Sequence, residues 1–312
     1  MSAPLSVAAR IRGTRRARGQ RLVAAGLVAL PVLLLASGWL IWDNRRLVVT
    51  HSTVQVASAP DGEALRIAHV SDLHAADHGR FQDELVAAIE VRGVDLVALS
   101  GDLIDRGTVD LGPVLDLAAR LDAIAPTYFV LGNHEADSPL REELLEGLAE
   151  AGVLILRDEA TTFEAKGRTL TLAGLDDPRV AAVDDAVPAD PGSVLEGLDL
   201  GAVPAGEQRG GAPSGPTMLL AHRPELLEEY AGHGVDLVLS GHAHGGQVRL
   251  PLLGPLFAPH QGPLPALTEG IHRQGGTTMV VSRGLGNGVA PVRVNNPREL
   301  VIVDLVQEPS QS

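Results

Sequence analysis

The sequence predicts an α/β domain that follows a single N-terminal transmembrane helix. Three observations support this fold class. An uncharged apolar stretch lies near the N-terminus. Beyond it, short apolar runs of strand length alternate with segments of helical spacing. Several of these runs end directly in Asp, Asn or His, so polar side chains should gather at the carboxyl ends of the strands of a sheet.

Composition limits the kinds of site that the chain can hold. The chain has 312 residues, enough for one large domain with a full hydrophobic core after the N-terminal segment. It contains no cysteine, which excludes disulfides, thiolate metal ligands and cysteine nucleophiles. Any bound metal must therefore be held by nitrogen and oxygen atoms.

Charge is divided unevenly along the chain. Residues 1–42 contain no acidic residue and six arginines, at positions 10, 12, 15, 16, 18 and 21. The rest of the chain holds all 39 acidic residues and has a net charge of about -20. An acidic domain repels a nucleic-acid backbone, so nucleic acid is not an expected partner. Phosphate chemistry stays open, because bound divalent cations reverse the local field.

Residues 22–42 read LVAAGLVALPVLLLASGWLIW, about the ~20 apolar residues that a helix needs to cross a bilayer. The arginines before this segment outnumber Arg45 and Arg46 after it, so the positive-inside rule places the N-terminus in the cytoplasm. We predict a cytoplasmic basic tail over 1–21, a single-pass anchor in the cell membrane over 22–42 and a linker over 43–62. The remaining domain would be extracytoplasmic.

A cleaved signal peptide is the alternative to an anchor. Ala36-Ser37-Gly38 offers the small residues of a cleavage site, but the apolar run continues through Trp42, which favours an uncleaved helix. Arg15-Arg16 could belong to a twin-arginine export signal.

The elements of the soluble part follow from apolar runs and helical spacing. Runs bounded by Gly and Asp suit strands buried on both faces, and they occur at 65–70, 96–99, 127–131, 153–156, 170–173, 218–221, 237–239, 279–281 and 300–305. Helical spacing occurs at 81–91, 114–121, 139–151 and 224–230. Residues 181–216 are rich in Gly, Pro, Ala and Asp, which indicates an insertion or mobile loop.

Five polar motifs directly follow expected strands. They are Ser71-Asp72-Leu73-His74, Gly101-Asp102, Gly132-Asn133-His134-Glu135, His222 and Gly241-His242-Ala243-His244. Five of the 11 histidines lie in these motifs. Asp72 and His74, like His242 and His244, are two residues apart, so in extended backbone their side chains would point the same way. Mixed carboxylate, carboxamide and imidazole ligands suit Mn, Fe or Zn.

The ordered set D-x-H, GD, GNHE, H and GHxH resembles the calcineurin-like metallophosphoesterase superfamily, from about residue 67 to the C-terminus. GHAHGGQ at 241–247 and PVRVNNPREL at 291–300 resemble the bacterial membrane-anchored phosphodiesterase branch of that superfamily. Some members of that branch hydrolyse the pyrophosphate of a lipid-A precursor. The resemblance implies a four-layer α/β/β/α sandwich over 63–307.

The resemblance also implies a dinuclear centre. One ion would be held by Asp72, His74, Asp102 and His244, and a second by Asp102, Asn133, His222 and His242. Asp102 would bridge two divalent transition-metal ions (Mn, Fe or Zn), and His134 would be the catalytic residue beside the leaving group. Substrate-binding residues are not predicted.

The implied reaction is hydrolysis of a phosphodiester or pyrophosphate by a metal-activated hydroxide. Lipid-linked and cell-envelope phosphoesters are candidate substrates. A phosphomonoesterase of the same fold is one alternative, and a membrane-tethered metal-binding protein without catalysis is another. A β-lactamase-like hydrolase would need an H-x-H-x-D-H cluster, which is absent.

Other polar residues are expected to be structural. Asp105 and Arg106 suit a solvated loop or helix cap, with a role in shaping the pocket as the alternative. Asp176-Asp177 suits a turn before proline, with a position in the cleft as the alternative. His69 is expected in the core, and His260 on the surface or in a loop.

Overall fold

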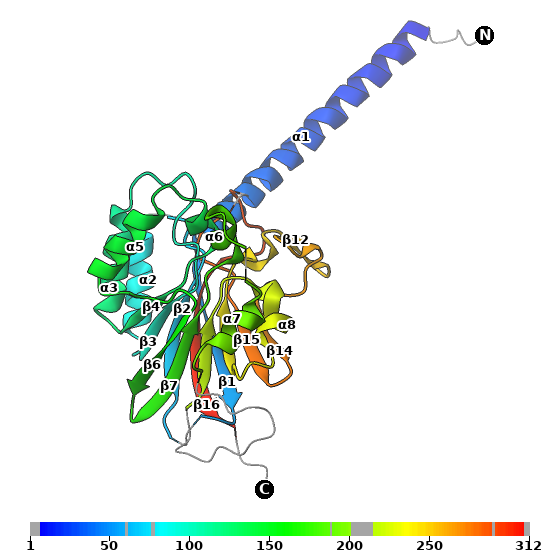
Figure 1. Ribbon diagram of the computed structural model, residues 1–312. Helices are drawn as coiled ribbons and strands as arrows, with labels where there is room; N and C mark the ends of the chain where they lie inside the picture. Colours follow the sequence, from blue (N-terminus) through cyan, green and yellow to red (C-terminus); the bar gives the residue numbers. More distant parts are fainter. Residues whose placement is uncertain are drawn as a thin grey trace, which may run out of the picture.

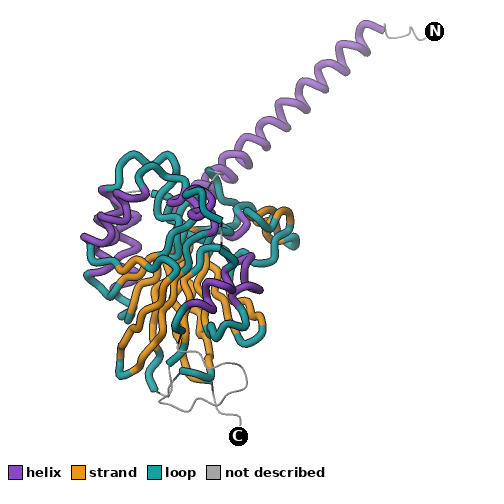
Figure 2. The backbone as a smooth tube through the Cα atoms, in the orientation of Figure 1, coloured by secondary structure: helices purple, strands orange, loops and turns teal. Residues whose placement is uncertain are grey.

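The computed structural model describes residues 7–59, 62–75, 79–187, 189–200, 215–288 and 291–308, with side chains at residue 20 and from residue 26 onward. Two six-stranded sheets pack face to face, and helices cover their outer faces (Figures 1 and 2). This arrangement confirms the predicted four-layer α/β/β/α sandwich. One long helix extends away from it.

The first sheet has the order β1-β16-β2-β3-β4-β5. Its strands are β1 (Leu47–Val56), β16 (Arg298–Gln307), β2 (Leu65–Val70), β3 (Leu96–Leu99), β4 (Thr127–Phe129) and β5 (Leu154–Ile155). From β2 to β5 all neighbours are parallel, whereas β16 runs antiparallel to β2 and parallel to β1. The carboxyl ends of β2, β3 and β4 therefore lie at one edge.

The second sheet has the order β14-β15-β9-β8-β7-β6. Its strands are β14 (Gly270–Gln274), β15 (Thr277–Val281), β9 (Leu237–Ser240), β8 (Thr217–Leu220), β7 (Arg168–Gly174) and β6 (Glu159–Ala165). The four central strands are parallel, and the outer strands β14 and β6 are antiparallel to their neighbours.

The outer layers are helical. The first sheet is covered by α2 (Arg80–Glu90), α3 (Gly112–Asp122) and α5 (Arg141–Glu150), and the second by α7 (Pro191–Gly197) and α8 (Leu227–Tyr230). Shorter elements are α4 (Asn133–Ala136), α6 (Pro178–Val183), η1 (Pro224–Leu226), η2 (His244–Gly246), β10 (Arg249–Leu250), β11 (Gly254–Pro255), β12 (Phe257–Ala258) and β13 (Gly262–Pro263). In α2, Phe81, Leu85 and Ile89 are buried, which is the spacing of one helix face.

Successive side chains of each central strand point to opposite faces of the sheet, so the core is divided into layers. Ile67 lies in the cluster between the sheets, while its neighbour Ala68 lies under the helices of the first sheet. In the second sheet, Leu239 faces the inter-sheet cluster and Val238 faces α7 and α8. Because both faces of these strands are buried, the sequence shows them as continuous apolar runs.

The N-terminal helix α1 (Val7–Arg45) includes a stretch, Gly26–Arg45, that is long and apolar enough to cross a membrane. Its large apolar side chains are exposed, with Leu27 at 70% and Leu35 at 74%. An exposed apolar surface of this kind marks a membrane or protein contact. An anchor and a signal sequence both account for it.

The structure bears on two predictions about segments. The expected linker over 43–62 contains β1, whose Val54 and Val56 lie in the inter-sheet core. Its outward residues are polar, so the segment resembled a linker. Within 181–216, α7 buries Leu195 in the core under the second sheet, so this part is packed structure. Residues 201–214 lie outside the described part of the chain.

Candidate metal centre

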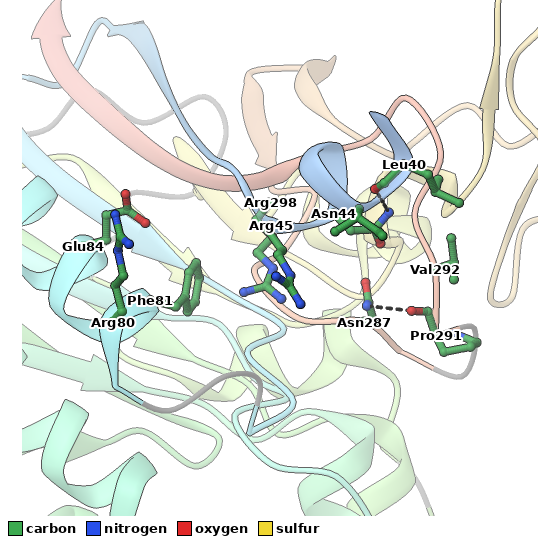
Figure 3. A pocket seen from close by; sticks show the side chains of 11 residues that line it. Leu40, Asn44, Arg45, Arg80, Phe81, Glu84, Asn287, Pro291, Val292 and Arg298 are labelled. Atoms are coloured by element: carbon green, nitrogen blue, oxygen red, sulfur yellow. Dashed lines mark hydrogen bonds between the residues drawn. The ribbon is translucent and has the colours of Figure 1, made fainter. Parts of the chain in front are cut away.

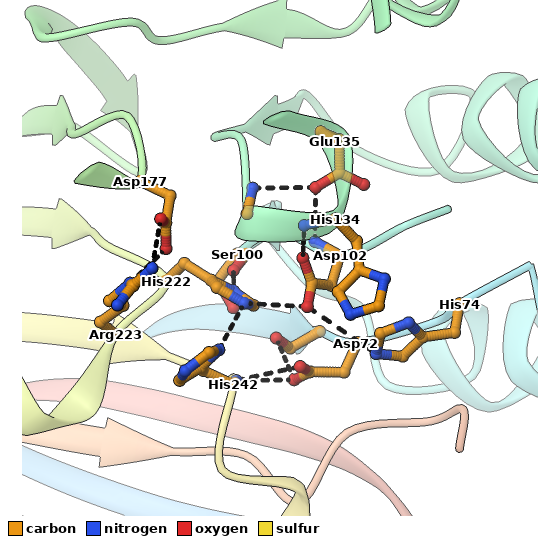
Figure 4. Close-up of polar contacts among 12 residues, drawn as sticks. Asp72, His74, Ser100, Asp102, His134, Glu135, Asp177, His222, Arg223 and His242 are labelled. Atoms are coloured by element: carbon orange, nitrogen blue, oxygen red, sulfur yellow. Dashed lines mark hydrogen bonds and ion pairs between the residues drawn. The ribbon is translucent and has the colours of Figure 1, made fainter. Parts of the chain in front are cut away.

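All five sequence motifs meet at one end of the two sheets (Figure 4). Each lies in the segment that follows a parallel strand: Asp72 and His74 after β2, Asp102 after β3, Asn133 and His134 at the start of α4 after β4, His222 after β8, and His242 and His244 after β9. Both sheets contribute, so the centre spans the gap between their strand ends.

Backbone hydrogen bonds tie the first two loops together. The Asp72 N–H donates to the Gly101 carbonyl (3.0 Å), and the His74 N–H donates to the Asp102 carbonyl (3.0 Å). Gly101 has φ 97°, and an added Cβ would lie 2.7 Å from His222 Nδ1. Only glycine fits this close approach without strain.

Glu135 joins the loop after β3 to the loop after β4. Its buried carboxylate accepts hydrogen bonds from the N–H groups of Asp102 (2.8 Å), Gly132 (2.8 Å) and Ile104 (3.1 Å). Burial, followed by the charge of Asp102, raises the pKa of Glu135 to about 6. The last residue of the GNHE motif therefore holds two loops of the centre at a fixed separation.

The backbone at the motif residues is left-handed rather than extended, which corrects the expectation for the D-x-H and H-x-H pairs. Asp72 and His74 have φ values of 50° and 49°, and His242 and His244 have 64° and 48°. The side chains converge because the loops turn sharply. Such conformations are unfavourable for residues other than glycine and gather at functional sites.

One group of possible ligand atoms comes from both sheets. Asp72, His74, Asp102 and His244 each offer an atom, and these atoms lie within 4.8 Å of one another. His74 Nε2 lies 3.1 Å from His244 Nε2, which in turn lies 3.4 Å from Asp72 Oδ1. All four residues are buried.

A second group shares Asp102. His222 Nε2 lies 3.1 Å from Asp102 Oδ2, and His242 Nδ1 lies 3.3 Å from His222 Nε2. Asp102, His222 and His242 form a second set of possible ligands. Among the described residues, Asn133 Oδ1 and His242 Nε2 are buried without a hydrogen-bond partner. Unpaired buried polar atoms are costly, and a cation would satisfy an oxygen of this kind.

Hydrogen bonds fix the orientation of two imidazoles. His74 Nδ1 donates to Asp105 Oδ1 (2.7 Å), and His222 Nδ1 donates to the Ser100 carbonyl (2.7 Å). In each ring Nε2 is thereby left to face the centre, as is usual for metal-bound histidines. Burial lowers the pKa of His242 and of His244, so these rings are neutral and able to ligate. The donor set therefore fits a pair of cations.

His134 lies beside these groups rather than within them. It lines a cavity of about 740 Å³ together with Asn133, His242, His244 and Phe257. Its Nδ1 is at ion-pair distance, 3.0 Å, from Asp105 Oδ1. Burial opposes ionisation of Asp105, but its contacts with His134 and His74 hold its pKa below the usual range.

Sequence reasoning placed Asp105, Asp177 and His260 mainly in loops or turns. In the structure each contacts a proposed metal ligand or the residue next to one. Asp105 joins His74 to His134. Asp177 is buried and accepts two hydrogen bonds from Arg223, the residue after His222. His260 stacks on His242, with ring centroids 5.3 Å apart. Of these three residues, only Asp105 could have been linked to the centre from the sequence, because it lies three residues after Asp102.

Comparison with known proteins points to one family. The family model described as calcineurin-like phosphoesterase matches residues 65–246. An uncharacterized metallophosphoesterase of Aquifex aeolicus is 30% identical, over 81% of this chain and 89% of its own. The Bacillus subtilis metallophosphoesterase YkuE is 28% identical, over 82% and 84%. The Escherichia coli phosphodiesterase YaeI is 29% identical, over 77% and 82%.

Proposed function

Because the chain belongs to the calcineurin-like phosphoesterase family, we propose that it hydrolyses phosphodiester or pyrophosphate bonds at the centre between the two sheets. The observation that carries this proposal is the convergence of buried nitrogen and oxygen donors from both sheets beside the cavity that His134 lines, with Asp102, Asn133, His242 and His244 on its wall. The similarity to the phosphodiesterase YaeI supports the diester preference. Phosphomonoester hydrolysis is the second candidate.

Seven of the motif residues are the proposed metal ligands. Asp72, His74, Asp102 and His244 would hold one ion, and Asp102, Asn133, His222 and His242 the other. Mn, Fe and Zn suit these donors. When bound, two such ions would lower the pKa of water to supply a hydroxide, and would stabilise charge on the phosphoryl oxygens.

The protein's own contribution would be to orient the substrate and move a proton. His134 lies on the cavity wall beside Asn133 and would stabilise phosphoryl charge or protonate the leaving oxygen. Asp105 would hold His134 at Nδ1 and leave Nε2 toward the cavity. The same carboxylate holds His74, so Asp105 is a positioning residue for a proposed ligand and for the proposed acid.

We further propose that the chain belongs to the membrane-anchored branch of the family and acts on a lipid-linked or cell-envelope phosphoester. Phe257 and Pro259 give the cavity an apolar wall. The neighbouring arm, residues 249–264, exposes Leu252, Leu253 and Leu264. The arm and the end of α1 lie at the same end of the molecule as the centre (Figure 1). Exposed apolar side chains of this kind suit an amphiphilic substrate.

The first prediction separates catalysis from metal binding. His134→Asn leaves the seven proposed ligands in place, so metal content should stay near two ions per chain while kcat falls by about 10² to 10⁴, the usual worth of a positioned acid or base. Asp102→Asn removes the proposed bridging charge, so metal content and activity should fall together. Elemental analysis and turnover of a chromogenic phosphodiester with added Mn would measure both quantities.

Substrates with different leaving groups sharpen this test. The loss in His134→Asn should shrink for good leaving groups, which need little protonation, and persist for alkyl esters. Chelation of the wild type should abolish turnover, and Mn, Fe, Co or Zn should restore it better than Ca. Full activity without any transition metal would contradict the dinuclear proposal. Tight metal binding without turnover of any phosphoester would favour a non-catalytic metal-binding protein.

A further inference from the structure

A second cavity, of about 700 Å³, lies where the end of α1 meets the catalytic domain (Figure 3). Leu40, Ile41 and Arg45 of α1 line one part of it, and Phe81 of α2 lines another. None of the proposed metal ligands lines this cavity. It is therefore a separate feature from the catalytic centre.

Hydrogen bonds hold the end of α1 firmly at the cavity. Asn44 Nδ2 donates to the Arg293 carbonyl and Asn44 Oδ1 accepts from the Arg293 N–H, both at 2.7 Å. The buried carboxylate of Asp43 accepts from the Asn296 N–H (3.2 Å). Because the helix end is fixed in this way, its side chains form a defined wall of the cavity.

Positive charge is concentrated around the cavity although the domain as a whole is acidic. Three arginines (Arg45, Arg80 and Arg298) line it, against one acid, Glu84. Among the described residues, Arg45 and Arg80 are not part of any ion pair. Arg298 is only 6% exposed, and its guanidinium lies 4.4 Å from the centre of the Phe81 ring. Figure 3 shows Arg45 and Arg298 directed into the space between Phe81 and Asn287.

We propose that this cavity binds the phosphate headgroup of an anionic membrane lipid. The proposal rests on the proposed role of α1 as a membrane anchor. Leu40 and Ile41 belong to the apolar span, and Arg45 ends it, so the cavity would lie at the level of the lipid headgroups. There, Leu40 and Ile41 would contact acyl chains. Guanidinium groups bind phosphate oxygens with paired hydrogen bonds, and arginine next to an apolar span is suited to this interface.

The experiment uses the full-length protein in a neutral detergent. Short-chain phosphatidylglycerol, phosphatidylcholine and inorganic phosphate are titrated separately, and bound ligand is measured by native mass spectrometry. Phosphatidylglycerol should bind at least tenfold more tightly than the other two ligands. In the double variant Arg45→Gln/Arg80→Gln its affinity should fall by about 25-fold, since a cation near an anionic lipid is worth about fivefold.

The matched control is Arg273→Gln, which removes an exposed positive charge from β14, away from this cavity. It should bind phosphatidylglycerol like the wild type. All variants should turn over a soluble phosphodiester equally, which shows that they are folded. Equal affinity in the double variant and the control would overturn the proposal. Inorganic phosphate that binds as tightly as phosphatidylglycerol would identify a free anion, not a lipid, as the ligand.

Carbonate extraction of membranes tests the anchor independently. The wild type should stay in the membrane pellet. A chain that is released by carbonate, yet selects phosphatidylglycerol through Arg45 and Arg80, would contradict the proposed anchor and still support the lipid site.

Discussion

His69 is fully buried in β2, where its Nε2 lies 2.8 Å from Ser100 Oγ. Burial lowers the pKa of His69 from 6.5 to about 3. The folded protein therefore keeps this ring neutral, whereas the unfolded chain protonates it below about pH 6.5. His69 therefore lowers the free energy of unfolding progressively as the pH falls from 6.5 toward 3. Above pH 6.5 it causes no such loss.

The prediction is that His69→Gln makes the free energy of unfolding less sensitive to acid. Between pH 7 and pH 5 the wild type should lose about 2 kcal/mol more than the variant, because each pH unit below 6.5 costs about 1.4 kcal/mol for one such group. Urea unfolding of both proteins at the two pH values gives this difference directly. Equal losses in the two proteins would show that His69 is not held neutral by the fold.

At the same scale, the sequence indicated which residues form the candidate centre but not the contacts that orient them. The motif residues were visible because each follows an apolar run. Glu135 accepts a hydrogen bond from a backbone N–H group of another loop, and Asp105 accepts one from an imidazole of another loop. Such contacts depend on tertiary structure. The left-handed backbone at Asp72 and His242 was equally hidden, because local sequence rarely specifies this conformation outside glycine.

At the scale of elements, only Arg46 lies between the end of α1 and the start of β1. It pairs along its whole length with β16 and contributes Val54 and Val56 to the core between the sheets. The segment between the helix and the domain is therefore part of the domain.

This placement predicts different outcomes for two truncations. A chain that begins at Asp43 keeps β1 and should unfold cooperatively as a monomer. A chain that begins at Glu63 exposes the edge of β16 and loses two buried valines, each worth about 1.5 to 3 kcal/mol, so it should aggregate or unfold at a much lower temperature. Size-exclusion chromatography and thermal unfolding distinguish the two. Similar behaviour of both chains would mean that β1 contributes little.

Helices and buried strands could be predicted because their apolar residues recur at helical spacing or form continuous runs. The expected helix at 81–91 is observed at Arg80–Glu90, and the strands buried on both faces stand out as apolar runs. β1 has apolar residues only on one face in its second half, so its pattern was too weak to separate it from a linker. Pairing with β16, more than two hundred residues later, decides its structure.

At the scale of the whole molecule, hydrogen bonds connect α1 to the candidate metal centre. Asp43 accepts a hydrogen bond from the Asn296 N–H, and Asn296 Nδ2 donates to the His244 carbonyl (2.6 Å). Arg293, whose backbone pairs with Asn44, places its guanidinium 3.4 Å from His244 Nδ1. The centre is thus held a short way from the end of α1, and an anchor in a bilayer would keep it near the membrane surface.

If α1 is an anchor, the charge distribution predicts on which side of the membrane the domain lies. Six arginines precede the apolar segment and only Arg45 and Arg46 directly follow it, so the domain should be extracytoplasmic. Protease added to intact spheroplasts should therefore digest the catalytic domain, while a cytoplasmic marker protein stays intact. An Ala36→Leu variant, which removes a small residue from the alternative cleavage site, should leave the size of the mature protein unchanged if α1 is an uncleaved anchor. Protection of the domain until lysis would mean that it faces the cytoplasm, and a wild-type protein shortened near residue 38 would identify α1 as a signal peptide.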